Sequence, residues 1–164
     1  MSIALIPGSF DPFTLGHVDL AERTARLFDR VVVAVMVNGE KSGTAGGCFT
    51  FAEREALAAA SLAHLPNVEV ISDSGLLVEL AQRIGATALV KGVRGTGDFD
   101  YEYNLARINR RLPPTVETLL LPADSAYDHI SATMVRDLLR HGRSPEAYLH
   151  PAAAALLKTW GRIS

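Results

Sequence analysis

The chain contains very little cysteine and very little lysine. Cys48 is the only cysteine among the 164 residues, so neither an intrachain disulfide nor a cysteine-based metal cluster can form. Lysine occurs only at positions 41, 91 and 158, and every other basic residue is arginine. Positive charge is not in excess either, because 16 Lys and Arg face 18 Asp and Glu, a formal net charge of −2. This balance argues against a protein that coats nucleic acid through bulk charge, and we expect no nucleic-acid partner.

Long hydrophobic runs are also absent. The longest, residues 31–37, has seven residues, whereas about 20 are needed to cross a bilayer. Residues 1–7 lack the basic and apolar segments of a signal peptide. We therefore expect a cytoplasmic protein with no membrane partner. With 48% hydrophobic and 21% charged residues, the composition is typical of one globular domain over residues 1–164.

Short apolar runs alternate with segments of helical periodicity. The runs show no polar alternation, which is typical of strands covered on both faces, and they predict strands at 3–6, 31–37, 68–71, 86–90 and 116–121. Between them, Thr50 and Glu53 form a capping box for a helix through residue 65, and Gly85 is placed to end another helix. The pattern predicts an α/β fold with a Rossmann-like, doubly wound sheet of five parallel strands in a single domain. Two short helices are expected in residues 131–164.

The first predicted strand runs into the segment richest in functional signals. Residues 7–17 read Pro-Gly-Ser-Phe-Asp-Pro-Phe-Thr-Leu-Gly-His. Gly8 allows a ligand to approach the backbone, and Ser9 adds a hydroxyl group beside it. Gly16 and His17 begin a helix, whose free N–H groups attract phosphate. A histidine there can donate to phosphoryl oxygens, so we predict a phosphate site rather than a structural turn.

Two common nucleotide-binding motifs are missing. A dinucleotide fingerprint needs three glycines after a strand, and the first loop has only Gly8 and Gly16. Residues 39–42 resemble the end of a P-loop, but position 34 is alanine where the earlier glycine is required. The chain is therefore predicted to be neither a nicotinamide dehydrogenase nor a P-loop NTPase.

Two further segments follow predicted strands. Lys91 and Arg94, surrounded by glycines, suit the binding of phosphate groups. Asp98 is better placed to cap the next helix than to act in catalysis. Residues 129–136 begin another helix, in which Ser131 is the predicted N-cap and Thr133 adds a second hydroxyl group.

Other parts of the sequence leave alternatives open. Residues 42–47 follow the second strand and can form either an active-site flap or a solvated connector. The arginines at positions 107, 110 and 111 are read as a solvated or subunit-contact face. The five histidines show no metal-ligand spacing, and no Ser-His-Asp arrangement is legible. Phosphate affinity without an evident nucleophile favours direct phosphoryl or nucleotidyl transfer.

These motifs resemble those of the nucleotidyltransferase superfamily. The resemblance lies in Gly-Ser-Phe-Asp-Pro at 8–12, Thr-x-Gly-His at 14–17 and the Ile-Ser segment at 130–131. It is strongest to the bacterial phosphopantetheine adenylyltransferase family and extends from residue 3 to about residue 157. Two features narrow the match: Thr14, where relatives acting on nicotinate mononucleotide usually have histidine, and the stretch 91–102.

The resemblance implies transfer of the adenylyl group of ATP to 4′-phosphopantetheine. This in-line displacement gives dephospho-coenzyme A and pyrophosphate, the penultimate step of coenzyme A synthesis. The implied catalytic residues are His17, Lys41 and Arg94, and the implied contacts of phosphopantetheine are Ser9, Lys41, Leu77 and Lys91. The implied ATP contacts are Gly8, Ser9, Phe10, His17, Gly92, Val93, Arg94, Glu102, Tyr127, Asp128, His129, Ile130, Ser131, Ala132 and Thr133.

The same resemblance implies Mg²⁺ that enters with ATP and is held by substrate phosphates, which agrees with the lack of a legible protein metal site. It also implies a homohexamer and makes feedback by coenzyme A possible. Two other functions stay open at this point. One is another nucleotidyltransferase of the superfamily, acting on nicotinate mononucleotide or transferring a cytidylyl group. The other is a nucleotide-binding module without catalysis.

Overall fold

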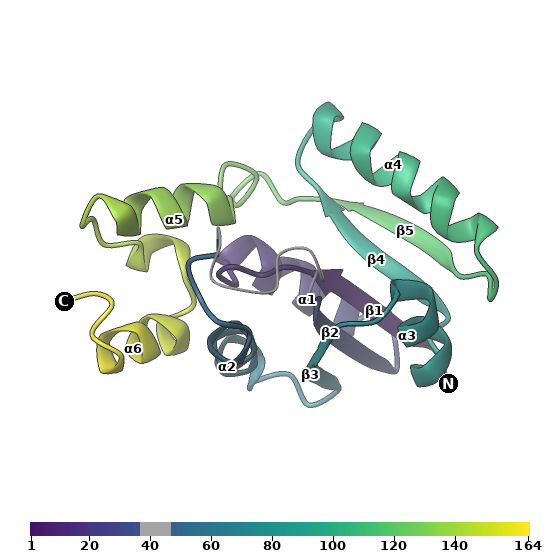
Figure 1. The fold of residues 1–164 in the computed structure, drawn as a ribbon, viewed down its shortest axis with the longest axis horizontal. Coiled ribbons are helices and arrows are strands. Elements are labelled where there is room, and N and C mark those ends of the chain that lie inside the picture. The colour runs from purple at the N-terminus through teal and green to yellow at the C-terminus, as the bar shows by residue number, and fades with distance from the viewer. Residues whose placement is uncertain (37–46) are drawn as a thin grey trace.

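The computed structural model of the protein describes residues 1–36 and 47–164. Its centre is a sheet of five parallel strands in the order β3-β2-β1-β4-β5 (Figure 1). The strands are β1 Ile3–Gly8, β2 Arg30–Met36, β3 Val68–Asp73, β4 Ala88–Val93 and β5 Glu117–Pro122. The predicted α/β fold with a doubly wound, five-stranded parallel sheet is confirmed.

Helices follow each strand. They are α1 Leu15–Ala25, α2 Phe51–Leu62, α3 Leu77–Ile84, α4 Thr96–Arg111, α5 Ala132–Arg140 and α6 Pro151–Thr159, with a short 3₁₀ turn, η2 Glu146–Tyr148, before α6. The predicted caps are present: Thr50 and Glu53 form the capping box of α2, Gly85 ends α3 at φ 70°, and Ser131 accepts a bond from the N–H of Met134. α2 ends at Leu62, three residues before the predicted end. No helix among the described residues is long and apolar enough to cross a membrane.

The interior strand β2 is buried on both faces, and each face packs against a different set of helices. Val31, Val33 and Val35 pack with α1 and α2, whereas Val32 and Ala34 pack with α3. A strand in this position must be apolar at every residue, because neither face meets water. The burial of β2 on both faces therefore explains why the residues at 31–36 are all apolar.

The two edge strands depart from the prediction that every strand is covered on both faces. Both β3 and β5 contain exposed residues, and Leu119 of β5 is 42% exposed. For β5 the cause is the incomplete cover by α4, since none of the residues Thr96–Arg111 of this helix is fully buried. Figure 1 shows α4 and β5 together at one side of the molecule, away from α5 and α6.

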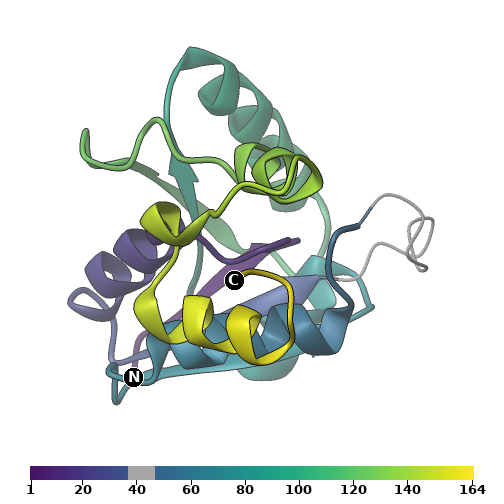
Figure 2. The same ribbon diagram turned by 90° about the vertical axis from the view of Figure 1, so that its left-hand side faces the viewer.

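A third apolar cluster brings the C-terminal segment onto the sheet domain. It joins α2, α5 and α6 through the buried side chains of Phe49, Leu57, Val135, Leu149, Ala153 and Leu157. Figure 2 shows α6 alongside α2, with α5 above them. This packing holds the N-terminus of α5 near the loop that follows β1.

The order of the strands determines where a ligand can bind. From β1 the chain builds the sheet toward β2 and β3, and from β4 it builds it in the opposite direction toward β5. β1 and β4 are neighbours, paired at Leu5 and Leu89. In open α/β sheets the ligand crevice lies beyond the carboxyl ends of the strands at this point of reversal.

We expect Leu157→Ala to lower the free energy of unfolding by about 2–5 kcal/mol, because it leaves a cavity between α6 and α2. Leu157 is 0% exposed, whereas Leu27 is 64% exposed. Leu27→Ala is therefore the matched control, and its effect should stay within about 0.5 kcal/mol. Urea unfolding followed by circular dichroism measures both. Equal effects of the two variants would show that α6 does not contribute to the folded core.

Candidate active site

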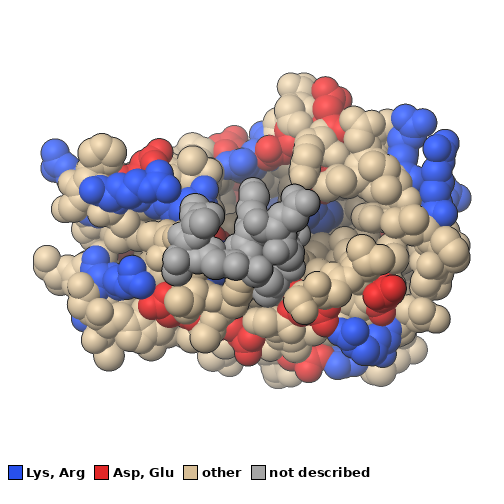
Figure 3. Space-filling model, viewed as in Figure 1, with Lys and Arg blue, Asp and Glu red and all other residues tan. Residues whose placement is uncertain are grey.

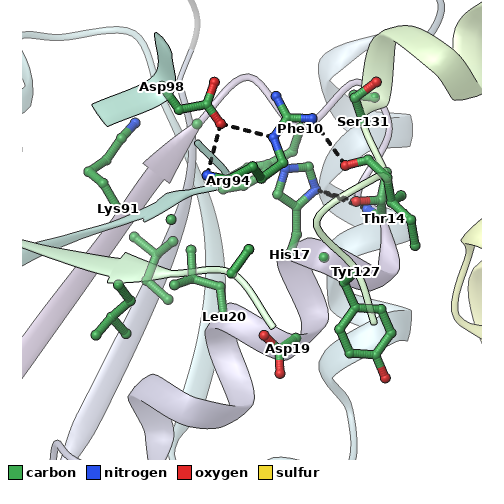
Figure 4. A pocket seen from close by; sticks show the side chains of 18 of the residues that line it. Phe10, Thr14, His17, Asp19, Leu20, Lys91, Arg94, Asp98, Tyr127 and Ser131 are labelled. Carbon is green, nitrogen blue, oxygen red and sulfur yellow. Dashed lines mark hydrogen bonds and ion pairs between the residues drawn. The ribbon is translucent and has the colours of Figure 1, made fainter. Parts of the chain in front are cut away.

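A cavity of about 380 Å³ opens beyond the carboxyl ends of β1 and β4. Its size is within the range of small-molecule sites. The three segments singled out in the sequence meet there: the loop after β1, the end of β4 with the start of α4, and the loop before α5 (Figure 4). The predicted site residues that line it are Gly8, Ser9, Phe10, His17, Lys91, Gly92, Arg94, Glu102, Tyr127, Ile130, Ser131, Ala132 and Thr133.

Four predicted residues of the described part of the chain are not among those that line the cavity. Val93 is buried at the end of β4, and Asp128 and His129 are exposed neighbours of Tyr127. Leu77 packs at the start of α3 against the apolar cluster on the other face of the sheet. Lys41 lies outside the described residues, as does the predicted flap except for Gly47. The functions assigned to these residues stay predictions.

The loop after β1 is shaped by close packing around Gly8 and Phe10. A Cβ atom on Gly8 would lie 2.7 Å from Cζ of Phe10, so a side chain at position 8 would displace the ring. Phe10 itself is 4% exposed and has φ 44°, in the left-handed region that non-glycine residues rarely adopt. The ring centroids of Phe10 and Phe13 lie 5.0 and 5.2 Å from that of His17. The imidazole thus packs against two aromatic rings of the loop, whose own centroids lie 5.0 Å apart.

The start of α1 determines which nitrogen of His17 carries the proton. The backbone N–H of Thr14, the N-cap residue, donates to Nδ1 of His17 over 3.0 Å. Because an amide N–H can only donate, Nδ1 must present its lone pair, and the neutral ring carries its proton on Nε2. Figure 4 shows the imidazole between the side chains of Thr14 and Arg94. Within the part of the chain that the structure describes, the Nε2–H group has no hydrogen-bond partner, and because His17 lines the cavity this group can donate to an acceptor there.

The surroundings of His17 also keep the imidazole uncharged. Burial, together with the positive charges of Arg94 and Lys91, lowers the pKa of His17 from 6.5 to about 4. At neutral pH the side chain is a neutral hydrogen-bond donor. Such a donor can stabilise negative charge on a phosphoryl oxygen without giving up its proton.

Arg94 is held at the cavity by partners from two segments. Its Nε donates to Oδ2 of Asp98 over 2.9 Å, and Nη1 donates to the carbonyl oxygen of Ile130 over 3.1 Å. Asp98 also accepts a bond from the backbone N–H of Arg94 over 3.1 Å, consistent with its predicted place at the start of a helix. Burial alone would raise the pKa of Asp98, but the bonds from Arg94 hold that pKa below its usual value. The ionised carboxylate therefore orients the guanidinium group before any ligand binds.

Lys91 is held in a similar way by partners from two segments. Its Nζ lies 3.3 Å from Oε1 of Glu102 on α4 and donates to the carbonyl oxygen of Pro7 over 3.3 Å. The ammonium group thus bridges the end of β1 and the first turns of α4. Glu102, predicted to contact ATP, is the acidic partner of this lysine in the structure.

Sequence reasoning missed several residues that line the cavity. Arg136 donates to the carbonyl oxygen of Asp11 over 2.8 Å and to Oγ1 of Thr133 over 3.1 Å. Its spacing of three from Thr133 places both on one face of α5, a signal that the sequence contained. Asp19 and Arg23 of α1 also line the cavity, and Arg23 donates to the carbonyl oxygen of Pro122 over 2.8 Å. No sequence signal identified this pair, because its position depends on where β5 ends.

Comparison with solved structures agrees with this fold. The chain superimposes with a TM-score of 0.68 on a protein from Vibrio parahaemolyticus assigned as a nicotinate-nucleotide adenylyltransferase, at 19% identity and with 99% of this chain and 95% of the other covered. It superimposes with a TM-score of 0.71 on a bifunctional NMN adenylyltransferase/ADP ribose pyrophosphatase from Francisella tularensis, at 12% identity, covering 97% of this chain and 49% of the other. At these identities the likeness establishes the fold alone.

Sequence comparison establishes the family. The model of the cytidylyltransferase-like family matches residues 5–138, which includes the three segments around the cavity. A phosphopantetheine adenylyltransferase from Levilactobacillus brevis is 44% identical over 142 residues, covering 87% of this chain and 86% of the relative. The chain therefore belongs to the cytidylyltransferase-like nucleotidyltransferases and, among them, to the phosphopantetheine adenylyltransferase family. The family predicted from the motifs is confirmed.

We expect ¹⁵N NMR of the ligand-free protein to show His17 with an unprotonated Nδ1 and a protonated Nε2, and to show that it stays neutral down to about pH 4. Below pH 6.5 the unfolded chain binds a proton at this residue that the folded chain does not. Folding stability should therefore fall between pH 6.5 and 4, by up to about 3 kcal/mol from this group. His17→Asn should remove this component, and a His17 signal that titrates near pH 6.5 would contradict the assignment.

Proposed function

We propose that this chain transfers the adenylyl group of ATP to 4′-phosphopantetheine, with release of dephospho-coenzyme A and pyrophosphate. The observation that carries the proposal is the neutral His17 at the N-terminus of α1, with its Nε2–H free and two oriented cations, Lys91 and Arg94, in the same cavity. The 44% identity to a phosphopantetheine adenylyltransferase supports this choice of acceptor. A nucleotide-binding module without catalysis would not need the imidazole of His17 to be held in one tautomer.

In this proposal the phosphate of the acceptor attacks the α-phosphorus of ATP in line with the departing pyrophosphate. A phosphate monoester is already largely an anion at neutral pH, so no general base is needed. Negative charge grows on the equatorial oxygens of the transferred group and on the leaving group. His17 donates its Nε2 proton as a hydrogen bond to one of these oxygens, together with free N–H groups at the start of α1. Catalysis then consists of positioning and charge stabilisation.

The walls of the cavity divide between the two substrates. We assign ATP to the side formed by Ser9, Arg94 and residues 127–133. We assign the phosphate of phosphopantetheine to the side of Lys91, and Lys41 and Leu77 to the same substrate on the family pattern. Lys91 and Arg94 lie three residues apart at the end of one strand, and this supports a site in which two phosphate groups meet.

We also propose that Mg²⁺ enters with ATP. Within residues 1–36 and 47–164, no three His, Cys, Asp or Glu side chains are grouped so that they could hold a metal ion. The two carboxylates of Asp98 and Glu102 are already paired with Arg94 and Lys91. Phosphate oxygens of ATP would thus supply the ligands, and the ion would neutralise charge on the pyrophosphate that leaves.

We expect the protein to release pyrophosphate from Mg-ATP with 4′-phosphopantetheine as acceptor, and not with nicotinate mononucleotide. His17→Ala should retain ATP binding but lose about 100- to 1000-fold in kcat, the range for removal of one transition-state donor. His141→Ala, at an exposed residue outside the cavity that His17 lines, is the control and should be unaffected. Turnover with the nicotinate acceptor would favour the other superfamily activity, and a fully active His17→Ala would exclude the role of His17.

The proposal extends to the oligomeric state of the protein and to its inhibition. We propose a homohexamer in the cytoplasm in which α4 contributes to a subunit contact. This helix exposes the apolar side chains of Phe99, Tyr101, Tyr103 and Ile108, an unusual surface for a monomer. Figure 3 shows basic side chains gathered over its carboxyl-terminal end, where Arg107, Arg110 and Arg111 are exposed. We further propose that coenzyme A inhibits by competition, because it contains the phosphopantetheine group.

We expect Ile108→Glu to dissociate the assembly, because the substitution buries a charge in an apolar contact. Ile108 is 55% exposed in the isolated chain, so the substitution should not disturb its fold. Light scattering after size exclusion gives the mass of each form. Leu27→Glu, on a side chain that is 64% exposed and lies outside α4, is the matched control and should keep the mass of the unmodified protein. A monomeric unmodified protein, or a hexameric Ile108→Glu, would contradict the contact at α4.

A further inference from the structure

Arg54 and Asp11 form a buried ion pair beneath the active-site loop. Asp11 is 5% exposed and Arg54 9% exposed, and Nε of Arg54 lies 3.3 Å from Oδ1 of Asp11. Neither residue lines the cavity. Asp11 also accepts bonds of 2.9 Å from the backbone N–H groups of Cys48 and Phe49. The pair therefore joins the loop after β1 to the segment that leads into α2.

The guanidinium group of Arg54 bonds on both sides of the strained residue Phe10. Its Nη1 donates to the carbonyl oxygen of Ser9 over 3.3 Å, and its Nε faces the carboxylate of Asp11. Nε also donates to the carbonyl oxygen of Phe49 over 2.9 Å. A positive φ at a bulky side chain persists only where neighbouring contacts hold it. Arg54 supplies such contacts at the residue before Phe10 and at the residue after it.

Phe10 in turn touches the proposed catalytic group. Its ring meets the imidazole of His17 edge to face, with 5.0 Å between ring centroids. The same loop ends in Thr14, whose N–H binds Nδ1 of His17. A shift of the loop at residues 9–11 would therefore move both the ring that packs on His17 and the donor that orients it.

We propose that Arg54, paired with Asp11, is a positioning residue for adenylyl transfer, which holds the loop of residues 9–14 so that His17 faces the reacting phosphoryl group. The role depends on the shape of the side chain as well as on its charge. A guanidinium group presents donors in several fixed directions, and here they serve Ser9, Asp11 and Phe49 together, whereas a lysine presents a single point of charge. The guanidinium group of Arg54 is also closely packed, because a Cβ atom on Gly47 would lie 2.3 Å from Nη2 of Arg54. This inference rests on the proposed function, because it assumes that adenylyl transfer is the reaction for which His17 is positioned.

Arg54→Lys tests this role while keeping a positive charge opposite Asp11. Displacement of a catalytic group by about 1 Å can lower a rate about 100-fold, so we expect kcat to fall about 10- to 100-fold. KM for ATP should change by less than about threefold, because His17 acts mainly on the transition state. The matched control is Arg162→Lys: Arg162 stacks on Phe49 at 5.3 Å and pairs with Glu53 at 3.0 Å, but has no bond to the loop. It should retain full activity.

A double-mutant cycle separates positioning from a general effect on the fold. If Arg54 acts through His17, Arg54→Lys should lower kcat by less than about twofold in a His17→Ala background. The same 10- to 100-fold loss in both backgrounds would overturn the proposal. Thermal unfolding of each variant shows whether it is folded at the assay temperature. If Arg54→Lys does not fold, Asp11→Asn provides the same test, because it removes the negative charge opposite Arg54 while its single amide oxygen can still accept one of the two bonds from Cys48 and Phe49.

A measurement without substrates keeps this proposal distinct from the proposed function. In ligand-free Arg54→Lys, ¹⁵N NMR should show His17 as a mixture of tautomers, because the bond from Thr14 is no longer held in place. Absence of turnover by the unmodified protein with 4′-phosphopantetheine would reject the proposed function and leave this readout intact. A folded Arg54→Lys with an unchanged His17 spectrum and an unchanged kcat would reject the positioning role.

Discussion

The rest of the active site depends on the bond from the Thr14 N–H to Nδ1 of His17. This bond uses an amide group that every helix N-terminus leaves free, and it turns a residue of the first helical turn into an oriented donor. The position of the helix follows from the sheet, since α1 starts directly beyond the end of β1 at the point where strand order reverses. The chemical property of the site, a neutral Nε2–H aimed into a cavity, is thus a consequence of backbone geometry.

The two cations of the cavity are also oriented by other groups of the protein. Without acidic partners, the positive charges of Lys91 and Arg94 would repel each other in the ligand-free cavity. Glu102 and Asp98 pair with them and hold each cation in one orientation. Both cations also donate to backbone carbonyl oxygens, of Pro7 and Ile130 respectively. A phosphate that enters meets cations already in place, so little reorganisation is required during the reaction.

Much of the fold could be predicted because a strand that is buried on both faces appears in the sequence as an uninterrupted run of apolar residues. The run at 31–36 is apolar at every position, and the strand that it forms, β2, is covered on both sides. The same reasoning failed for β5, where Leu119 is exposed, because an apolar run does not reveal how much of it a helix will cover. Arg136 and Arg23 were missed for a related reason. Each reaches the cavity from a helix whose place depends on packing far away in the sequence.

The sequence alone determined the class of chemistry and the family. The segment at 8–17 combines a glycine, a hydroxyl group and a histidine at a helix start, and these residue types in this order carry a local signal. Only the tertiary structure decided that Lys91 pairs with Glu102, that Arg94 reaches the carbonyl oxygen of Ile130, and that Arg54 lies under the loop. Such contacts join residues far apart in the sequence, 84 positions in the case of Lys91 and Pro7. Local periodicity and capping rules describe neighbours along a chain, whereas these contacts arise from the parallel pairing of distant strands.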